Sequence, residues 1–108
     1  MILKRYEVYL ANLDPTIGSE INKTRPVVIV SDDAMNKSLN TLVVCPLTTK
    51  LHPMWRSRIQ IVCSNKDAEI AVDQIRTISK KRLTKKIDKL SAQNAALLRQ
   101  IITEMYGG

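Results

Sequence analysis

The chain has 108 residues, of which 44% are hydrophobic and 25% are charged. This length suits one domain, residues 1–108, with a core of its own and no room for a second domain. No apolar run approaches the roughly 18 residues of a membrane-spanning helix, and the N-terminus has no signal-peptide pattern, so we expect a cytoplasmic protein without a membrane partner.

The charge of the chain is strongly basic and unevenly placed. Seventeen Lys and Arg residues against ten Asp and Glu give a formal net charge of +7. Nearly all of the surplus lies between Arg76 and Lys89, where seven basic residues accompany one acid, Asp88. Such a run is often a solvated face, but with this total charge a polyanion or an acidic protein is the leading class of partner.

Metal and disulfide chemistry find little support in the sequence. Cys45 and Cys63 lie in apolar segments without the spacing of a metal or redox motif, so we expect buried free thiols. His52 is the only histidine, and no cluster of Cys, His, Asp and Glu has the spacing of metal ligands. We therefore expect neither a metal nor a cofactor.

The N-terminal third of the chain predicts two strands joined by a long loop. Lys4–Leu10 alternates apolar and polar residues, as a half-buried strand does. Turn residues then mark a loop that extends to Thr24. Pro26–Ser31 is rich in β-branched residues and lacks polar alternation, which predicts a strand buried on both faces.

The middle of the chain predicts one short helix and several short strands. Ser31, Asp32 and Asp33 can each cap a helix over residues 34–39. Strands are expected over Leu42–Leu47, stopped by Pro46, and over residues 58–63, 70–75 and 77–83, with a turn over residues 65–67.

The C-terminal segment predicts one amphipathic helix that begins after Ser91 as N-cap. Its apolar stripe is wide enough to pack on a sheet or to form a dimer interface. The residues of the stripe are Ala95, Leu97, Leu98, Ile101, Ile102 and Met105. Five or six short strands followed by this helix predict a small, strongly bent antiparallel sheet or barrel.

The basic surplus invites a test of the sequence for RNA cleavage through the 2′-hydroxyl. A two-histidine mechanism is excluded by the single histidine, and the acids form no convincing metal-ligand set. The remaining candidates are Arg25 as a phosphate clamp and Thr48 or Thr49 as hydroxyl donors. Pro26 restricts the backbone of Arg25 to an extended conformation, so the position of Arg25 is well determined. Glu20 is the nearest carboxylate in sequence to Arg25. Arg25 could instead be a solvated residue ahead of a core strand, without a catalytic role.

A set of short motifs in a fixed order resembles the MazF/PemK toxin family, the endoribonuclease halves of bacterial toxin–antitoxin pairs. These motifs are Glu7-Val8-Tyr9, Leu13-Asp14-Pro15-Thr16, Gly18-Ser19-Glu20, Arg25-Pro26-Val27-Val28, Pro46-Leu47-Thr48, Asp73-Gln74-Ile75-Arg76-Thr77-Ile78 and Arg82-Leu83. Each motif alone is weak, but the ordered set runs through most of the chain and is specific.

The resemblance implies a mainly β (α+β) fold: a small SH3-like barrel of five to seven strands with a C-terminal helix, as in MazF, PemK and CcdB. It also implies a homodimer that cleaves single-stranded RNA, usually mRNA, at specific sequences and without a metal, and that an acidic antitoxin protein inhibits. The essential Arg of the family maps to Arg25 and its essential Thr to Thr48. The family's Glu in the first loop maps to Glu20, and its Gln in the fifth-strand motif maps to Gln74.

The chemistry of these side chains favours some of the implied roles over others. Arg25 suits an electrostatic clamp better than a proton carrier, because the pKa of arginine exceeds about 12. Thr48 would donate to a phosphate oxygen, and Glu20 would either act as a base or orient Arg25, with orientation slightly favoured.

Contacts to unpaired RNA are expected from residues of the loops, through stacking and phosphate binding. Trp55 could instead cap the barrel, and Gln74 could be a polar residue of a half-exposed strand. The candidate RNA-binding residues are Ser19, Lys23, Thr49, Lys50, Trp55, Arg56, Gln74 and Arg76.

The chain departs from the family pattern at two places. Many relatives carry glycine between the positions of Glu20 and Arg25, whereas this loop reads Ile21-Asn22-Lys23-Thr24, which is stiffer and more basic. Tyr6 replaces the usual glycine before Glu7 and is expected to face inward. A non-catalytic toxin that binds a target such as DNA gyrase is the alternative function, and a plain nucleic-acid-binding regulator is a third.

Overall fold

The computed structural model describes residues 2–108, which form seven strands, two α-helices and two 3₁₀ turns. The strands are β1 (Glu7–Asn12), β2 (Thr24–Ile29), β3 (Thr41–Thr48), β4 (Arg58–Cys63), β5 (Lys66–Ala71), β6 (Arg76–Ser79) and β7 (Leu83–Lys89). The helices are α1 (Asp33–Ser38) and α2 (Ala92–Tyr106), and the 3₁₀ turns cover Val72–Gln74 and Lys80–Arg82.

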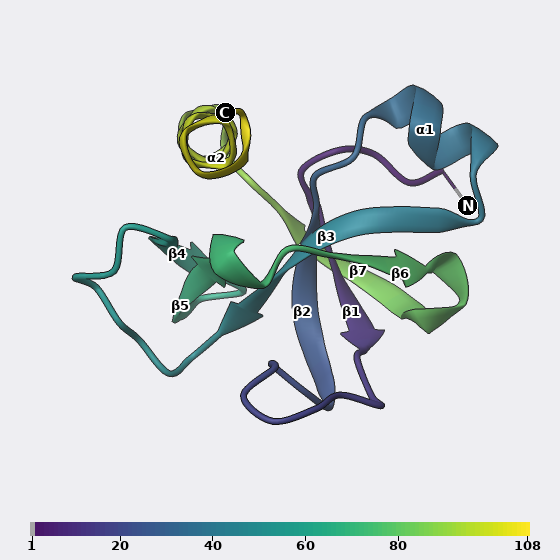
Figure 1. Cartoon of the computed structure of the whole chain (residues 1–108). Helices are drawn as coiled ribbons and strands as arrows, with labels where there is room; N and C mark the ends of the chain where they lie inside the picture. The colour runs from purple at the N-terminus through teal and green to yellow at the C-terminus, as the bar shows by residue number, and fades with distance from the viewer. Residues whose placement is uncertain (1) are drawn as a thin grey trace.

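The strands form one strongly curled antiparallel sheet in the order β4-β5-β3-β2-β1-β7 (Figure 1). The long strand β3 organises it, because one of its edges pairs first with β6 and then with β5. The backbone N–H of Ser64, in the β4–β5 turn, donates to the carboxylate of Asp88 on β7 at 3.0 Å. The two ends of the sheet therefore meet, and the curled sheet with a terminal helix is confirmed.

Hydrophobic side chains form two core clusters among residues 2–108, and β2 separates them. Val28 faces the cluster that α2 covers with Ala95 and Leu98. Val27 and Ile29 face the other cluster, on the opposite side of the strand. The expected burial of β2 on both faces is confirmed.

Strand β1 is also buried on both faces, so the prediction of a half-buried strand over Lys4–Leu10 is wrong. Val8 belongs to the first cluster. Tyr9 belongs to the second, which also contains Leu3. The strand begins only at Glu7, because Tyr6 has a positive φ of 71° and forms a turn. Tyr6 itself is half-buried and packs against the first cluster.

Pro46 does not stop β3, which continues to Thr48. Along the edge that pairs with β6 and β5, the β6 ladder ends at Val44 and the β5 ladder starts at Leu47. Pro46 falls in this interruption, where a residue without an N–H is tolerated.

The second half of the sheet differs from the sequence prediction in its boundaries. Strand β4 has the predicted bounds, but the turn consists of Ser64 and Asn65, which both have positive φ, as a type I′ hairpin turn requires. Strands expected over residues 70–75 and 77–83 are replaced by β5, β6 and β7. The basic strand β7 was not predicted, because its sequence lacks apolar alternation.

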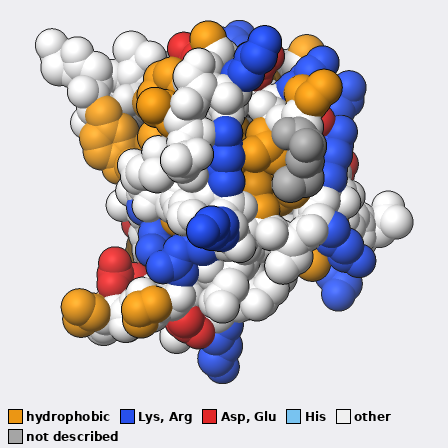
Figure 2. Space-filling model, turned by 90° about the vertical axis from the view of Figure 1, so that its right-hand side faces the viewer, with side chains coloured by type: hydrophobic (Ala, Val, Ile, Leu, Met, Phe, Trp, Pro, Cys, Tyr) orange, Lys and Arg blue, Asp and Glu red, His pale blue; other side chains and the backbone are white. Residues whose placement is uncertain are grey.

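Both helices begin at the predicted caps. Asp32 accepts a hydrogen bond from the N–H of Met35, and Ser91 accepts one from the N–H of Asn94. No helix among residues 2–108 is long and apolar enough to cross a membrane. Figure 2 shows Lys and Arg side chains spread over the face of the molecule near α1, β6 and the N-terminal segment.

The two cysteines are buried and free, as expected. Burial raises the pKa of the Cys45 thiol to about 12, and the nearby charge of Asp73 acts in the same direction. Cys45 therefore behaves as a small hydrophobic residue of the core at neutral pH.

Candidate functional site

Arg25 and Thr48 come together at the open end of the β2–β3 pair. The register pairs Val27 with Pro46 and Val28 with Cys45, and continuing it by two residues places Arg25 opposite Thr48. Both residues line one cavity of about 220 Å³. The half-buried Arg25 is oriented by the carbonyl of Asn22, which accepts from Nε at 3.1 Å.

The lining of this cavity suits an anion. Thr49 and Lys66 lie beside Arg25 and Thr48, while Ile87 of β7 contributes an apolar wall. The hydroxyl of Thr48 accepts from the N–H of Lys50 at 3.1 Å and keeps its own hydrogen to donate to another acceptor. We call this cavity the cleavage pocket. Its lining, within residues 2–108, holds basic and hydroxyl side chains but no carboxylate.

A neighbouring cavity of about 360 Å³ gathers several of the predicted RNA-binding residues. Thr48 lines both cavities, so the two adjoin. Four candidates of the sequence analysis share the second cavity with Thr48, namely Ser19, Lys50, Trp55 and Gln74.

Trp55 lies in the loop between β3 and β4, with about half of its surface exposed. Its ring stacks on His52 with centroids 3.9 Å apart, and the guanidinium of Arg58 lies 4.7 Å from the Trp55 ring centroid. The aromatic side chain is thus held in place yet accessible, which suits stacking on an unpaired base.

Beneath this loop lies a buried ion-pair network centred on Glu69. The carboxylate of Glu69 accepts from Arg58 at 2.6 Å, from Gln60 at 2.7 Å and from the backbone N–H of His52 at 2.6 Å. Arg58 also donates to Asp73 at 2.8 Å. The side chains of Glu69 and Arg58 are 0% and 6% exposed, so this central pair is shielded from water, while Asp73 lies at the exposed edge of the network.

The hydrogen bonds of this network keep its acids ionised. Burial alone would raise the pKa of Glu69, but the bonds from Gln60, His52 and Arg58 together lower it below its usual range. Burial likewise opposes ionisation of Asp73, whose pKa is nevertheless lowered, chiefly by the bond from Arg58. The network therefore contains two carboxylates around one buried guanidinium at neutral pH.

The β1–β2 loop is fastened to the sheet by side chains from the C-terminal half. Gln74 accepts from the N–H of Ile21 at 2.6 Å and donates to the carbonyl of Ser19 at 3.5 Å. Arg76 donates to the carbonyl of Leu13 at 3.3 Å. Arg82 donates to the carbonyls of Asn12, at 3.1 Å, and Asp14.

Glu20 and Arg25 line different cavities. The Glu20 carboxylate accepts from the N–H of Ile17 at 2.5 Å and lines a cavity of about 320 Å³ with Ser19, Gln74 and Arg76. Within residues 2–108 no ion pair joins Glu20 to Arg25.

Two other predicted contact residues lie outside these cavities. Arg56 is exposed and forms an ion pair with Glu104 of α2 at 3.4 Å. Lys23 is exposed, has a positive φ of 65°, and uses its backbone to bond the carboxylate of Asp14 at 3.1 Å.

Sequence reasoning missed Lys66 in the cleavage pocket and the roles of Glu69 and Arg58. One signal for the network was present, since Glu69 is the single acid in the apolar run from Ala68 to Val72. A lone carboxylate in such a strand needs buried partners. Among residues 2–108 no group of His, Cys, Asp and Glu is arranged to hold a metal ion.

The chain is similar to known proteins over most of its length. The family described as PemK-like, MazF-like toxin of type II toxin-antitoxin system matches residues 4–106. Endoribonuclease EndoA from Bacillus subtilis (strain 168) is 37% identical over 95 residues, which cover 83% of this chain and 82% of that protein.

Solved structures match over nearly the whole chain. MazF from Deinococcus radiodurans has a TM-score of 0.87 at 17% identity, covering 100% of this chain and 99% of that chain. An endoribonuclease from a mycobacterial species, in complex with its cognate antitoxin, has a TM-score of 0.81 at 19% identity, covering 97% and 95%. At these identities the two matches establish the fold.

Proposed function

The chain belongs to the PemK-like, MazF-like toxin family and is an endoribonuclease, and on this premise we propose that it cuts single-stranded RNA in the cleavage pocket. The observation that carries the proposal is that Arg25 and Thr48, at the ends of two paired strands, line one cavity. A guanidinium and a hydroxyl in such an arrangement can bind the two non-bridging oxygens of one phosphate.

The proposed reaction is an attack of the 2′-hydroxyl on the adjacent phosphorus. The 2′-hydroxyl loses its proton to solvent water as its oxygen forms a bond to phosphorus. The bond to the 5′-oxygen breaks and that oxygen takes up a proton from water, so the products carry a 2′,3′-cyclic phosphate and a 5′-hydroxyl. Arg25 stabilises the charge that develops on the phosphate, and Thr48 donates to the same group. Because the pocket offers cations and hydroxyls where a metal site needs carboxylates, we propose that the reaction requires no metal.

Glu20 has a positioning role in this proposal. Its carboxylate closes the turn from Ile17 to Glu20 and does not touch Arg25. The loop that it orders borders the cavity with Gln74 and Arg76, where RNA bases next to the cut would lie.

Sequence preference is assigned to the second cavity and its rim. Trp55 would stack on one base, while Lys50 contacts a phosphate and Ser19 and Gln74 contact base edges. Thr49, beside Thr48, would add a hydroxyl contact, and Lys23 and Arg56 would contribute charge from the surrounding loops.

The proposed partners are an acidic antitoxin and a second copy of the chain. A mycobacterial structural relative was solved with its cognate antitoxin, and the net charge of +7 suits an acidic inhibitor. Leu97 and Met105 of α2 stay partly exposed and could pack in a homodimer. The place of action we propose is the cytoplasm, where mRNA is available.

The deciding experiment is cleavage of a long single-stranded RNA by the purified protein in excess EDTA. The wild type should give discrete fragments that end in a cyclic phosphate and a 5′-hydroxyl, whereas Arg25→Ala should give none. Absence of cutting by folded wild-type protein free of antitoxin, or equal cutting by Arg25→Ala, would refute the proposal.

A further inference from the structure

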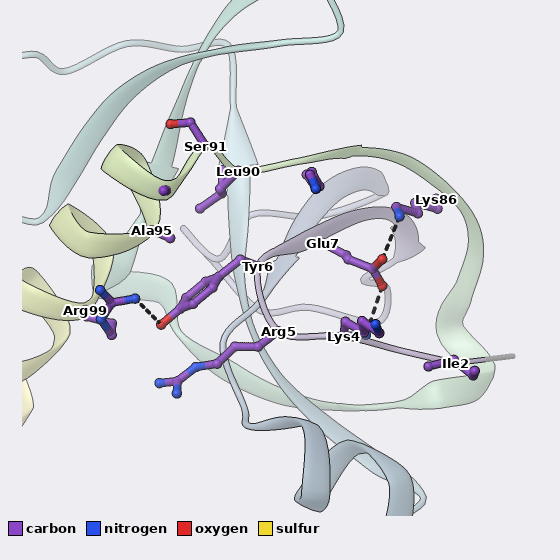
Figure 3. Close-up of a pocket in the computed structure, with 12 residues that line it drawn as sticks. Ile2, Lys4, Arg5, Tyr6, Glu7, Lys86, Leu90, Ser91, Ala95 and Arg99 are labelled. Atoms are coloured by element: carbon purple, nitrogen blue, oxygen red, sulfur yellow. Dashed lines mark hydrogen bonds and ion pairs between the residues drawn. The ribbon is translucent and has the colours of Figure 1, made fainter.

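A separate cavity of about 820 Å³ lies between the segment before β1, the end of β7 and the first turns of α2 (Figure 3). Its lining is rich in cations: Lys4, Arg5, Lys86, Lys89 and Arg99. We call it the Tyr6 pocket, after the aromatic residue that projects from the turn before β1 toward α2.

The acid of this lining, Glu7, is already engaged. Its carboxylate pairs with Lys86 at 2.6 Å and accepts from the backbone N–H of Lys4 at 2.9 Å, as Figure 3 shows. The ion pair neutralises Lys86. The lining offers no second carboxylate to balance the charges of the other four cations, Lys4, Arg5, Lys89 and Arg99. The pocket is therefore a concentrated positive region.

The two arginines are held in place around the ring of Tyr6. The guanidinium carbons of Arg5 and Arg99 lie 5.1 Å and 5.7 Å from the ring centroid, and Arg99 also donates to the Tyr6 hydroxyl at 3.4 Å. Cation–π contacts of this kind hold a guanidinium without using all of its donors. An incoming anion thus meets cations that are already positioned.

Helix α2 adds to the positive field. Ser91 and Ala92, at its N-terminus, line the pocket, and no acidic residue lies in its first turn. The positive end of this 15-residue helix is therefore not compensated by its own side chains.

Strand β7 connects the Tyr6 pocket to the cleavage pocket. Ile87 lines the cleavage pocket, whereas Lys86 and Lys89 line the Tyr6 pocket. An RNA strand with its scissile phosphate at Arg25 would cross β7 to bring neighbouring phosphates to these cations. It would pass Asp88, whose carboxylate accepts from the N–H groups of Ser64 and Lys89.

We propose that the Tyr6 pocket binds backbone phosphates of the substrate RNA that lie beyond the cleavage site. This inference rests on the proposed function. A polynucleotide is favoured over an acidic protein because β7 lines both pockets, and because positioned guanidiniums match the oxygens of a phosphate.

The test compares Lys89→Gln/Arg99→Gln with Lys37→Gln/Lys81→Gln, which removes the same charge from exposed positions outside both pockets. Both pairs are made in the uncleaving Arg25→Ala background, and binding to RNAs of about 4 and about 16 nucleotides is measured over a range of salt. The pocket variant should bind the longer RNA roughly 10-fold more weakly at 0.1 M salt, with a salt slope smaller by about 1.4. Its affinity for the short RNA should not change.

Each other outcome would overturn the inference. Equal losses in the two double variants would assign the effect to net charge, and an unchanged affinity for the longer RNA would remove the pocket from the RNA path. Binding of a polyglutamate peptide is measured with the same variants. If the pocket variant bound this peptide more weakly but bound both RNAs normally, the pocket would be assigned to an acidic protein partner.

Failure of the proposed function gives a different result. Wild-type protein would then leave RNA intact, whatever the Tyr6 pocket binds. With the natural Arg25 restored, Lys89→Gln/Arg99→Gln should still cleave the short RNA, which shows that this variant is folded.

Discussion

Glu69 lies directly opposite Thr48 in the ladder between β5 and β3, and it is fully buried. The same carboxylate holds Arg58 and the backbone of His52. One buried anion is therefore tied both to the strand end that presents Thr48 and to the loop that presents Trp55.

Replacing Glu69 by Gln should destabilise the protein by about 3 kcal/mol. The substitution keeps the shape of the side chain but removes the charge that pairs with Arg58, which is only 6% exposed. Breaking one partner of a buried pair costs about 3–5 kcal/mol, and the remaining bond to Asp73 argues for the lower end. Urea unfolding measures the change.

Asp67→Asn is the matched control, because Asp67 is an exposed acid on the same strand and should leave the midpoint nearly unchanged. The sequence also supplies a local reporter, since Trp55 is the only tryptophan. The glutamine carbonyl can keep the bond from the N–H of His52, but the weakened hold on Arg58, whose guanidinium lies 4.7 Å from the Trp55 ring centroid, should shift the Trp55 emission to longer wavelength and increase its quenching by iodide. An unfolding midpoint and an emission spectrum equal to those of the wild type would contradict the role given to Glu69.

Stability should fall in acid as the network is protonated. The folded-state pKa values of Glu69 and Asp73 are lowered, so their contribution is complete above the ordinary values of 4.5 and 3.8 and is lost as the pH falls through the lower folded values. Urea midpoints measured from pH 7 to about pH 3 should drop below about pH 4.5. The drop should be smaller in Glu69→Gln, and an equal drop in both proteins would place the acid sensitivity elsewhere.

Arg25→Lys tests whether the planar guanidinium matters beyond its charge. Lysine keeps the charge but loses the forked donors that bind two phosphate oxygens. We expect kcat to fall by about 100-fold or more while KM changes little, because the clamp acts on charge that develops in the transition state. Steady-state cleavage rates over a range of concentrations of a defined RNA measure both, and undiminished kcat would remove the clamp from the mechanism.

Glu20 distinguishes positioning from proton transfer. The carbonyl oxygen of Gln can still accept from the N–H of Ile17, so Glu20→Gln should retain most of the activity, whereas Glu20→Ala should lose it. The pH profile of kcat should keep its shape in Glu20→Gln. Inactivity of Glu20→Gln together with loss of an acidic limb in that profile would instead make Glu20 the base.

The parts of the fold that local chemistry controls were predictable from the sequence. Ser91 and Asp32 cap their helices as expected, because a cap needs only a side-chain oxygen next to free amides. Strand β2 was predictable because a continuous β-branched run has few alternatives to burial on both faces.

The parts that depend on distant partners were not predictable. Strand β7 is basic and has little apolar pattern, so its sequence does not indicate a strand. Its pairing with β1 makes this segment a strand. Pro46 continues a strand because the neighbouring ladders are interrupted beside it. The hydrogen bond between the N–H of Ile21 and the side chain of Gln74 joins residues 53 positions apart, and no local sequence pattern predicts such a contact.

The fastening of the β1–β2 loop has a consequence for how such a chain diversifies. Gln74, Arg76 and Arg82 reach the main chain of the loop and none of its side chains. Substitutions in the loop that spare Asp14 and Glu20, whose carboxylates bond its backbone, can therefore change what it recognises while its path stays the same. Ile21-Asn22-Lys23-Thr24 would be one such exchange, and successive exchanges could redirect a toxin to new RNA sequences without rebuilding its scaffold.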